Sequence, residues 1–239
     1  MVTPQLSLDV TLDVEARFET YHAGPNVEAV AALQQLPTPG IWLAGEPNSG
    51  RSHLLQAVIA AAPVGQAIFL PITQSLPASC VDGLPGNMTV CLDDVDTVAG
   101  NDEWERALLL LYENALKFDG RLVISATGNV AECGFRLPDV ESRLSSLARF
   151  RLRVPSDEDQ YAALLKRAEA RGLRLSEDAA AYMLKHLPRA LSTLFEWLRV
   201  LDHHSLSSGR KLTLPFVRGL VRESAADLQR AAELTGFDH

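Results

Sequence analysis

Short apolar runs alternate with helical patterns along the first two thirds of the chain. Four nearly continuous apolar runs have the character of strands buried on both faces of a parallel sheet; they cover residues 41–44, 67–70, 89–92 and 122–125. Between them, residues 52–62 and 103–118 carry apolar side chains at helical spacing, and Gly120 is expected to end the second helix. The alternation predicts an α/β fold, a parallel β-sheet core flanked by helices.

From Pro155 onward the pattern predicts helices alone. Ser156, Ser176 and Pro188 each stand where a helix could start. The expected helices lie near residues 157–171, 177–186, 189–203 and 215–222. This change predicts an α/β domain over residues 15–154, preceded by an N-terminal peptide and linker over residues 1–14. A small all-α domain with a C-terminal tail would cover residues 155–239.

The composition is that of an ordinary globular protein, with 47% hydrophobic and 22% charged residues among 239. No apolar run approaches the roughly 18 residues of a membrane span, and the N-terminus lacks a signal-peptide pattern. Three widely spaced cysteines indicate neither a disulfide framework nor a dedicated transition-metal site. We therefore expect a cytoplasmic protein without a membrane partner.

Net charge and its distribution bear on partners. The net charge of −8 argues against a protein whose main task is to coat nucleic acid, so DNA would be contacted only weakly or indirectly. Residues 1–142 carry a net charge of −12, whereas residues 143–222 carry a net charge of +7. Either the two parts pack head to tail in an assembly, or the later helices have Arg-rich solvated faces. Self-association stays open on this pattern.

A glycine-containing loop of the P-loop type stands between the first predicted strand and the following helix. The run has the form GxxxxG[K/R]S, and its flanks are those that the motif requires. Its backbone N–H groups and the helix N-terminus would bind the phosphates of ADP or ATP, and Ser52 would contact Mg²⁺. The expected nucleotide-binding residues are Gly45, Glu46, Pro47, Asn48, Ser49, Gly50, Arg51, Ser52 and His53. Arg51 replaces the usual Lys, so we expect binding with weak hydrolysis.

Two acids follow the third apolar run, as in a Walker B strand. Asp93 would help hold Mg²⁺, and Asp94 could orient an attacking water. Asp96 is expected to be a solvated turn residue. Ser125 and Thr127 end the next strand, where they are either a sensor of the γ-phosphate or plain turn residues.

The ordered segments GEPNSGRSHLL, VCLDDVD, LPDVESRL and the helical run from Pro155 resemble the DnaA-like AAA+ family. The resemblance spans roughly residues 6–221 and is closer to its Hda-type members. It implies an AAA+ P-loop NTPase core followed by a small all-α lid. It also implies that Arg143 is an arginine finger that acts in trans, although an arginine at a helix end is usually solvated.

Further roles follow from the same resemblance. Phe18 and Tyr21 would lie in an N-linker over the base, although aromatics three apart are more often core contacts. Arg189, in the first turn of a predicted helix, would be a second phosphate sensor. The N-terminal peptide resembles a sliding-clamp-binding segment that can lie extended in a groove. Its key residues are Gln5, Leu6, Leu8 and Val10.

The implied function is a clamp-tethered regulator that binds nucleotide and stimulates ATP hydrolysis on DnaA, limiting re-initiation of chromosomal replication. DnaA and the DNA polymerase sliding clamp are then the partners, and the chain's own ATPase activity is weak or absent. Two alternatives stay open. One is an ADP-sensing adaptor that recruits DnaA-like proteins without stimulating hydrolysis, and the other is a DNA-remodelling or helicase-loading ATPase.

Overall fold

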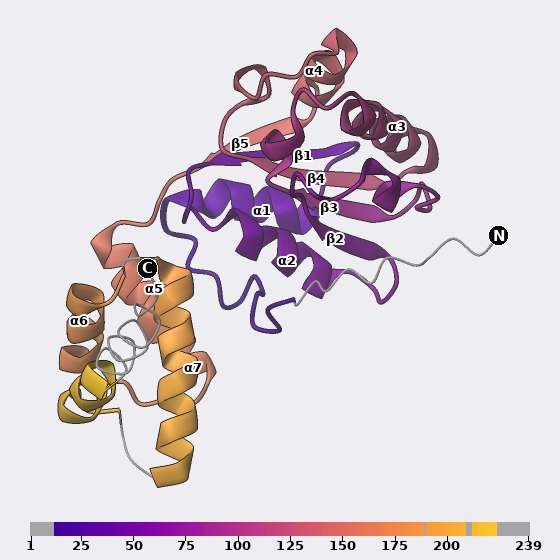
Figure 1. Cartoon of the computed structure of the whole chain (residues 1–239). Helices are drawn as coiled ribbons and strands as arrows, with labels where there is room; N and C mark the ends of the chain where they lie inside the picture. The colour runs from indigo at the N-terminus through magenta and orange to yellow at the C-terminus, as the bar shows by residue number, and fades with distance from the viewer. Residues whose placement is uncertain (1–11, 189, 209–211, 224–239) are drawn as a thin grey trace, which may run out of the picture. The chain divides into compact units, whose positions relative to one another are not determined.

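The computed structural model describes residues 12–188, 190–208 and 212–223. The chain divides into two compact units, Met1–Val154 and Pro155–His239. The first unit has an α/β fold and the second is built mainly of helices (Figure 1). Each unit has its own hydrophobic core.

The elements of the first unit alternate between strands and helices. The strands are β1 (Gly40–Gly45), β2 (Ala67–Pro71), β3 (Thr89–Asp93), β4 (Arg121–Ala126) and β5 (Ala148–Leu152). The α-helices are α1 (Val27–Gln35), α2 (Arg51–Ala61), α3 (Asp102–Phe118) and α4 (Pro138–Ser145). Short 3-10 turns are η1 (Gly24–Asn26), η2 (Ala78–Val81), η3 (Val95–Val98) and η4 (Val130–Glu132).

All strand pairs of the sheet are parallel, in the order β2-β3-β4-β1-β5. The register pairs Leu43 of β1 with Ser125 of β4, and Cys91 of β3 with Val123 of β4. Because the strands are parallel, their carboxyl ends lie at one edge of the sheet. The P-loop and the acids at the end of β3 therefore lie at that same edge.

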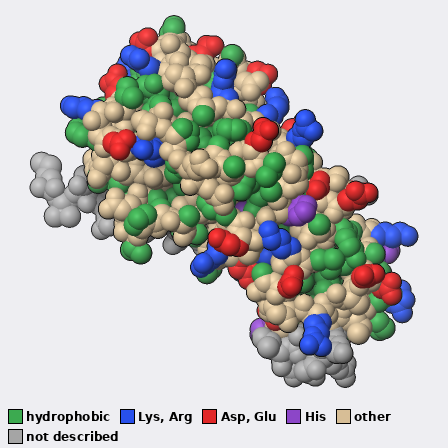
Figure 2. All heavy atoms as spheres, turned by 180° about the vertical axis from the view of Figure 1, so that it is seen from behind, with side chains coloured by type: hydrophobic (Ala, Val, Ile, Leu, Met, Phe, Trp, Pro, Cys, Tyr) green, Lys and Arg blue, Asp and Glu red, His purple; other side chains and the backbone are tan. Residues whose placement is uncertain are grey.

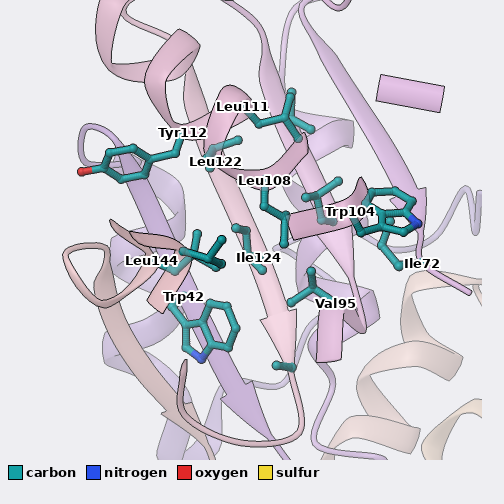
Figure 3. Packing of buried hydrophobic residues seen from close by; sticks show 14 of the residues in the cluster. Trp42, Ile72, Val95, Trp104, Leu108, Leu111, Tyr112, Leu122, Ile124 and Leu144 are labelled. Carbon is teal, nitrogen blue, oxygen red and sulfur yellow. The ribbon is translucent and has the colours of Figure 1, made fainter. Parts of the chain in front are cut away.

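Side chains of the central strands alternate between two buried clusters. In β1, Ile41 and Leu43 pack with α1 and α2, whereas Trp42 and Ala44 belong to the cluster beneath α3 and α4. Figure 3 shows Trp42 in this second cluster, below Leu144. The sheet is therefore covered on both faces, which explains why its central strands are almost entirely apolar.

The four predicted strands and both helices of the first part are confirmed, while one element was missed. β5 alternates exposed Arg149 and Arg151 with more buried neighbours, since it is an edge strand of the sheet. The prediction that Gly120 ends α3 is wrong in detail. The left-handed residue is Asp119, with φ of 58°, and the Gly120 N–H then donates to Ala115 O at 2.9 Å.

A buried carboxylate joins α3 to the segment before α4. Glu105 is 0% exposed. It accepts hydrogen bonds from the backbone N–H groups of Gly100 (2.8 Å), Arg136 (2.9 and 3.0 Å) and Leu137 (2.7 Å). Such charge-assisted bonds compensate for the loss of hydration. Leu137 is the N-cap residue of α4, so Glu105 fixes the start of that helix.

The second unit contains α5 (Asp157–Ala170), α6 (Glu177–His186), α7 (Leu191–Ser208) and a helix over residues 214–223. Ser156 and Ser176 cap α5 and α6 through their side chains, as predicted. The third helix begins at Leu191, three residues after Pro188. A leucine-rich cluster fills the core, and Arg167 is buried there with its guanidinium 4.9 Å from the Phe195 ring centre.

Charged side chains of both signs lie on the visible face of each unit in Figure 2. None of the helices in the described part of the chain combines the length and the apolar character that a membrane crossing needs.

The role of Glu105 predicts the effect of Glu105→Gln. The amide keeps the shape but places an NH₂ group where backbone N–H donors converge, so we expect a loss of about 2–4 kcal/mol in unfolding free energy. Chemical denaturation would measure it. Glu113→Gln, on the exposed part of the same helix, is the control and should stay within about 0.5 kcal/mol of the parent. Equal stability of the two variants would contradict this role.

Candidate functional site

The P-loop connects the end of β1 to the start of α2. Asn48 and Gly50 have positive φ of 67° and 93°, which turn the loop sharply before the helix. A Cβ on Gly45 would lie 2.4 Å from Ser49 Oγ, and one on Gly50 would lie 2.9 Å from Tyr21 Cε2. Both glycines are therefore required by close approaches, and the loop is compact as a phosphate cradle must be.

Ser125 joins the two acids at the end of β3, Asp93 within the strand and Asp94 just after it. Its hydroxyl donates to Asp93 Oδ1 and accepts a hydrogen bond of 2.9 Å from the Asp94 N–H. Asp94 itself has φ of 58°, in the left-handed region. The pairing of β3 with β4 thus brings Ser125 to the Walker B acids, as the strand order requires.

Arg51 of the P-loop forms an ion pair with Asp94. The distance from Nη2 to Asp94 Oδ1 is 2.7 Å, and the arginine side chain is 9% exposed against 44% for the aspartate. Burial and the neighbouring Asp93 raise the pKa of Asp94 above its ordinary value, while Arg51 acts in the opposite direction. The arginine that replaces the usual lysine therefore contacts the acid that we expected to orient water.

Asp96 differs from the expectation of a solvated turn residue. Its Oδ2 accepts a hydrogen bond from the Thr127 N–H at 3.1 Å and another from the Thr127 hydroxyl. The turn after β3 is thereby tied to the end of β4. Thr127 contacts this aspartate, whereas Ser125 contacts the two acids before it.

The segment before η1 packs on the P-loop. Tyr21 is buried, its hydroxyl lies 3.4 Å from Ser49 O, and its ring centre is 5.3 Å from that of His53. His53 Nε2 lies 3.1 Å from Arg17 O. Phe18 is half-buried against the cluster formed with α1 and α2. The two aromatics are thus core contacts, and Tyr21 also contacts the loop backbone.

Sequence reasoning missed Asn26. This buried residue donates from Nδ2 to the Tyr21 hydroxyl (3.2 Å) and to Arg153 O (3.0 Å), and its Oδ1 accepts from the Arg153 N–H (2.8 Å). It connects the aromatic residue over the P-loop with the chain just after β5. Nothing in the local sequence marks a single Asn for this role.

Two buried polar atoms of the loop bear on whether a phosphate fits. Ser49 Oγ and Arg51 Nη1 find no hydrogen-bond partner among the described residues. Buried donors without partners are costly, and phosphate oxygens would satisfy both. Ser52 is exposed at the first turn of α2. The loop therefore has the donors that a nucleotide's phosphates need.

The other predicted residues lie away from the loop or outside the described residues. Arg143 is exposed in the last turn of α4. Arg189 and the peptide residues Gln5, Leu6, Leu8 and Val10 lie outside the residues that the structure describes. Within the described ranges, no three His, Cys, Asp or Glu side chains are grouped so that they could hold a metal ion.

The sheet order, the P-loop between β1 and α2 and the helical second unit define an AAA+ fold. Similar solved structures agree with this class. Domain III of the Thermotoga maritima replication initiation protein DnaA matches with a TM-score of 0.70 and 16% identity, over 90% of this chain and 98% of that one. AMPPCP-bound DnaA from Aquifex aeolicus matches with a TM-score of 0.65 and 14% identity, over 94% of this chain and 74% of that one.

The Thermotoga maritima RuvB Holliday junction branch migration motor has the same core fold, with a TM-score of 0.54 and 15% identity over 79% of this chain and 63% of that one. Residues 157–221 match the family model described as the lid domain of Hda. The chain therefore combines the fold of DnaA domain III with a helical segment that matches the Hda lid model, in agreement with the resemblance in the sequence.

The contact between Gly50 and Tyr21 predicts a specific defect in Gly50→Ala. The new Cβ would collide with the ring and shift the loop, so we expect at least a tenfold loss of affinity for a fluorescent adenine nucleotide in a binding titration. Gly65→Ala is the matched control, because Gly65 also has positive φ (78°) but has nothing within 4 Å of its Cβ position. It should lose about 1 kcal/mol of stability without losing affinity. Unchanged affinity in Gly50→Ala would contradict the cradle.

Proposed function

We propose that this chain binds an adenine nucleotide at its P-loop and acts as an Hda-type regulator that stimulates ATP hydrolysis on DnaA. The observation that carries the proposal is the match of residues 157–221 to the Hda lid, joined to a P-loop with unsatisfied donors. The nucleotide analogue bound by the similar Aquifex aeolicus DnaA supports an adenine nucleotide as ligand.

Different residues around the loop would bind the phosphates and the Mg²⁺ ion. The backbone from Gly45 to His53, with Ser49 Oγ and Arg51 Nη1, would hold ADP or ATP. Ser52 with Asp93 and Asp94 would hold Mg²⁺, which neutralises phosphate charge when bound. Ser125 keeps the two aspartates in place through its two hydrogen bonds.

The ion pair between Arg51 and Asp94 supports weak hydrolysis at this site. A carboxylate that orients water offers an oxygen to it, and the arginine, 2.7 Å from Asp94 Oδ1, competes with water for that oxygen. The guanidinium also lacks the point charge with which a lysine reaches the phosphates. The site would hold nucleotide and stabilise the fold around it, with ADP as the proposed resident nucleotide.

Arg143 is the residue proposed to act on the partner's ATP. It is exposed on α4, and no ion pair holds it among the described residues. An arginine supplied in trans can stabilise the charge on a transferring phosphoryl group by several powers of ten in rate. In this proposal DnaA supplies the ATP and this chain supplies the arginine.

The N-terminal peptide is proposed to tether the chain to the sliding clamp in the cytoplasm. An extended peptide with Gln5 followed by apolar residues at alternate positions suits a groove that provides pockets and backbone hydrogen bonds. Stimulation of hydrolysis at the clamp would limit re-initiation of chromosomal replication. The adaptor without stimulation is the second candidate, and the Arg51–Asp94 ion pair is compatible with it, because an adaptor too would hold nucleotide without turning it over.

The variant Arg143→Ala tests the proposed role directly. It should bind the clamp and nucleotide normally but lower the stimulated hydrolysis of DnaA-bound ATP by at least 10³-fold in single-turnover measurements with DNA-loaded clamp. Arg106→Ala, an exposed arginine of α3, is the control and should stimulate like the parent. Full stimulation by Arg143→Ala would exclude the mechanism, and a parent chain that binds DnaA without stimulating it would favour the adaptor.

The tether is tested by the double variant Leu6→Ala and Leu8→Ala. Loss of two apolar anchors should weaken clamp binding at least tenfold in surface plasmon resonance. Leu12→Ala is the control, since this exposed leucine lies after Val10, the last of the proposed clamp-binding residues. Equal clamp affinity of both proteins would contradict the tether while leaving nucleotide binding unaffected.

A further inference from the structure

Helix α4 is attached to α3 near both of its ends. Glu105 of α3 accepts the Leu137 N–H at the N-cap of α4, and Tyr112 of α3 contacts Ser146 at its C-cap. Residues seven apart lie on one face of a helix, about 10 Å apart along its axis. This separation is close to the length of the eight-residue α4, about 12 Å. One face of α3 therefore holds both ends of the shorter helix.

The contact at the C-cap includes the backbone of Arg143. Ser146 Oγ donates to Arg143 O at 2.7 Å, and it lies 2.8 Å from the Tyr112 hydroxyl. A serine hydroxyl has a single proton, which the bond to Arg143 O uses. Tyr112 is therefore the donor to Ser146. The chain of bonds runs from Tyr112 through Ser146 to the backbone of the arginine.

The side chain of Arg143 also lies near Tyr112. Its Cζ is 5.9 Å from the Tyr112 ring centre, at the outer limit of a cation–π contact. The ring itself is buried in the cluster beneath α3 and α4, where Val140 and Leu144 of α4 are 0% and 1% exposed. In Figure 3 the hydroxyl of Tyr112 points away from the neighbouring Leu108 and Leu111. A buried ring thus lies beside an exposed arginine.

We propose that Tyr112 is a positioning residue that fixes Arg143 for its contact with the partner's phosphates, with Glu105 holding the other end of α4. An exposed arginine loses side-chain entropy when it is ordered at a binding site. Contacts that restrict it before binding reduce that loss and keep the guanidinium in a productive geometry. The inference rests on the proposed function of Arg143.

The test separates positioning from binding. In single-turnover hydrolysis of DnaA-bound ATP with DNA-loaded clamp, Tyr112→Phe removes only the hydroxyl and should lower the maximal stimulated rate about fivefold, the effect of one hydrogen bond. The chain concentration that gives half-maximal stimulation should stay unchanged. Ser146→Ala should give a similar fall, and combining the two should add nothing. Leu110→Ala, on the exposed face of α3, should behave like the parent.

The effect of Tyr112→Phe can be compared with and without Arg143, and this comparison distinguishes positioning of the arginine from a general structural role. In an Arg143→Ala background, Tyr112→Phe should have no further effect on the residual rate, because the group that it positions is gone. A parent rate in Tyr112→Phe, or the same fivefold fall with and without Arg143, would overturn the inference. If Arg143→Ala itself stimulates fully, the proposed function fails instead.

A spectroscopic measurement keeps the inference testable in that case. The Tyr112 ring should shift the side-chain NMR signals of Arg143, and Tyr112→Leu should move them to the values of a solvated arginine. Tyr112→Phe should keep most of the ring shift while increasing side-chain motion. Identical Arg143 signals in the parent and in Tyr112→Leu would show that the ring does not position the arginine.

Discussion

The parallel pairing of β3, β4 and β1 is the constraint on which the rest of the structure depends. Burial on both faces makes the middle of these strands apolar, so polar residues lie at the strand ends, and all the carboxyl ends lie at one edge of the sheet. That edge receives the P-loop from β1, the two aspartates from β3 and Ser125 from β4. The Arg51–Asp94 ion pair and the bonds of Ser125 then join these three segments.

Much of this arrangement could be predicted because it depends on local pattern. Continuous apolar runs marked four strands, the three inner ones and the edge strand β2, and a glycine-containing loop between strand and helix marked the P-loop. Serines ahead of helical runs marked the caps of α5 and α6. The helical second part agrees with the Hda lid match over residues 157–221. The placement of Ser125 near the aspartates followed from strand adjacency.

What the sequence did not predict depends on contacts between distant segments. β5 was missed because its exposed arginines interrupt the apolar run. No local feature distinguishes Glu105 from an exposed glutamate on a helix. The backbone N–H groups that bind it belong to residues 31 and 32 positions later in the chain. Asn26 bonds to Arg153 across 127 positions. Asp96 was expected in solvent for the same reason, since its partner Thr127 follows another strand, β4.

In the proposed function, this chain holds nucleotide at its own site while its exposed arginine promotes hydrolysis on a partner. Labelling the γ-phosphate of ATP on one protein at a time tests it most directly. With DNA-loaded clamp present, the account predicts rapid release of label from ATP bound to DnaA and slow release from ATP bound to this chain. Rapid release from this chain's own ATP, with the DnaA-bound label unaffected, would contradict it.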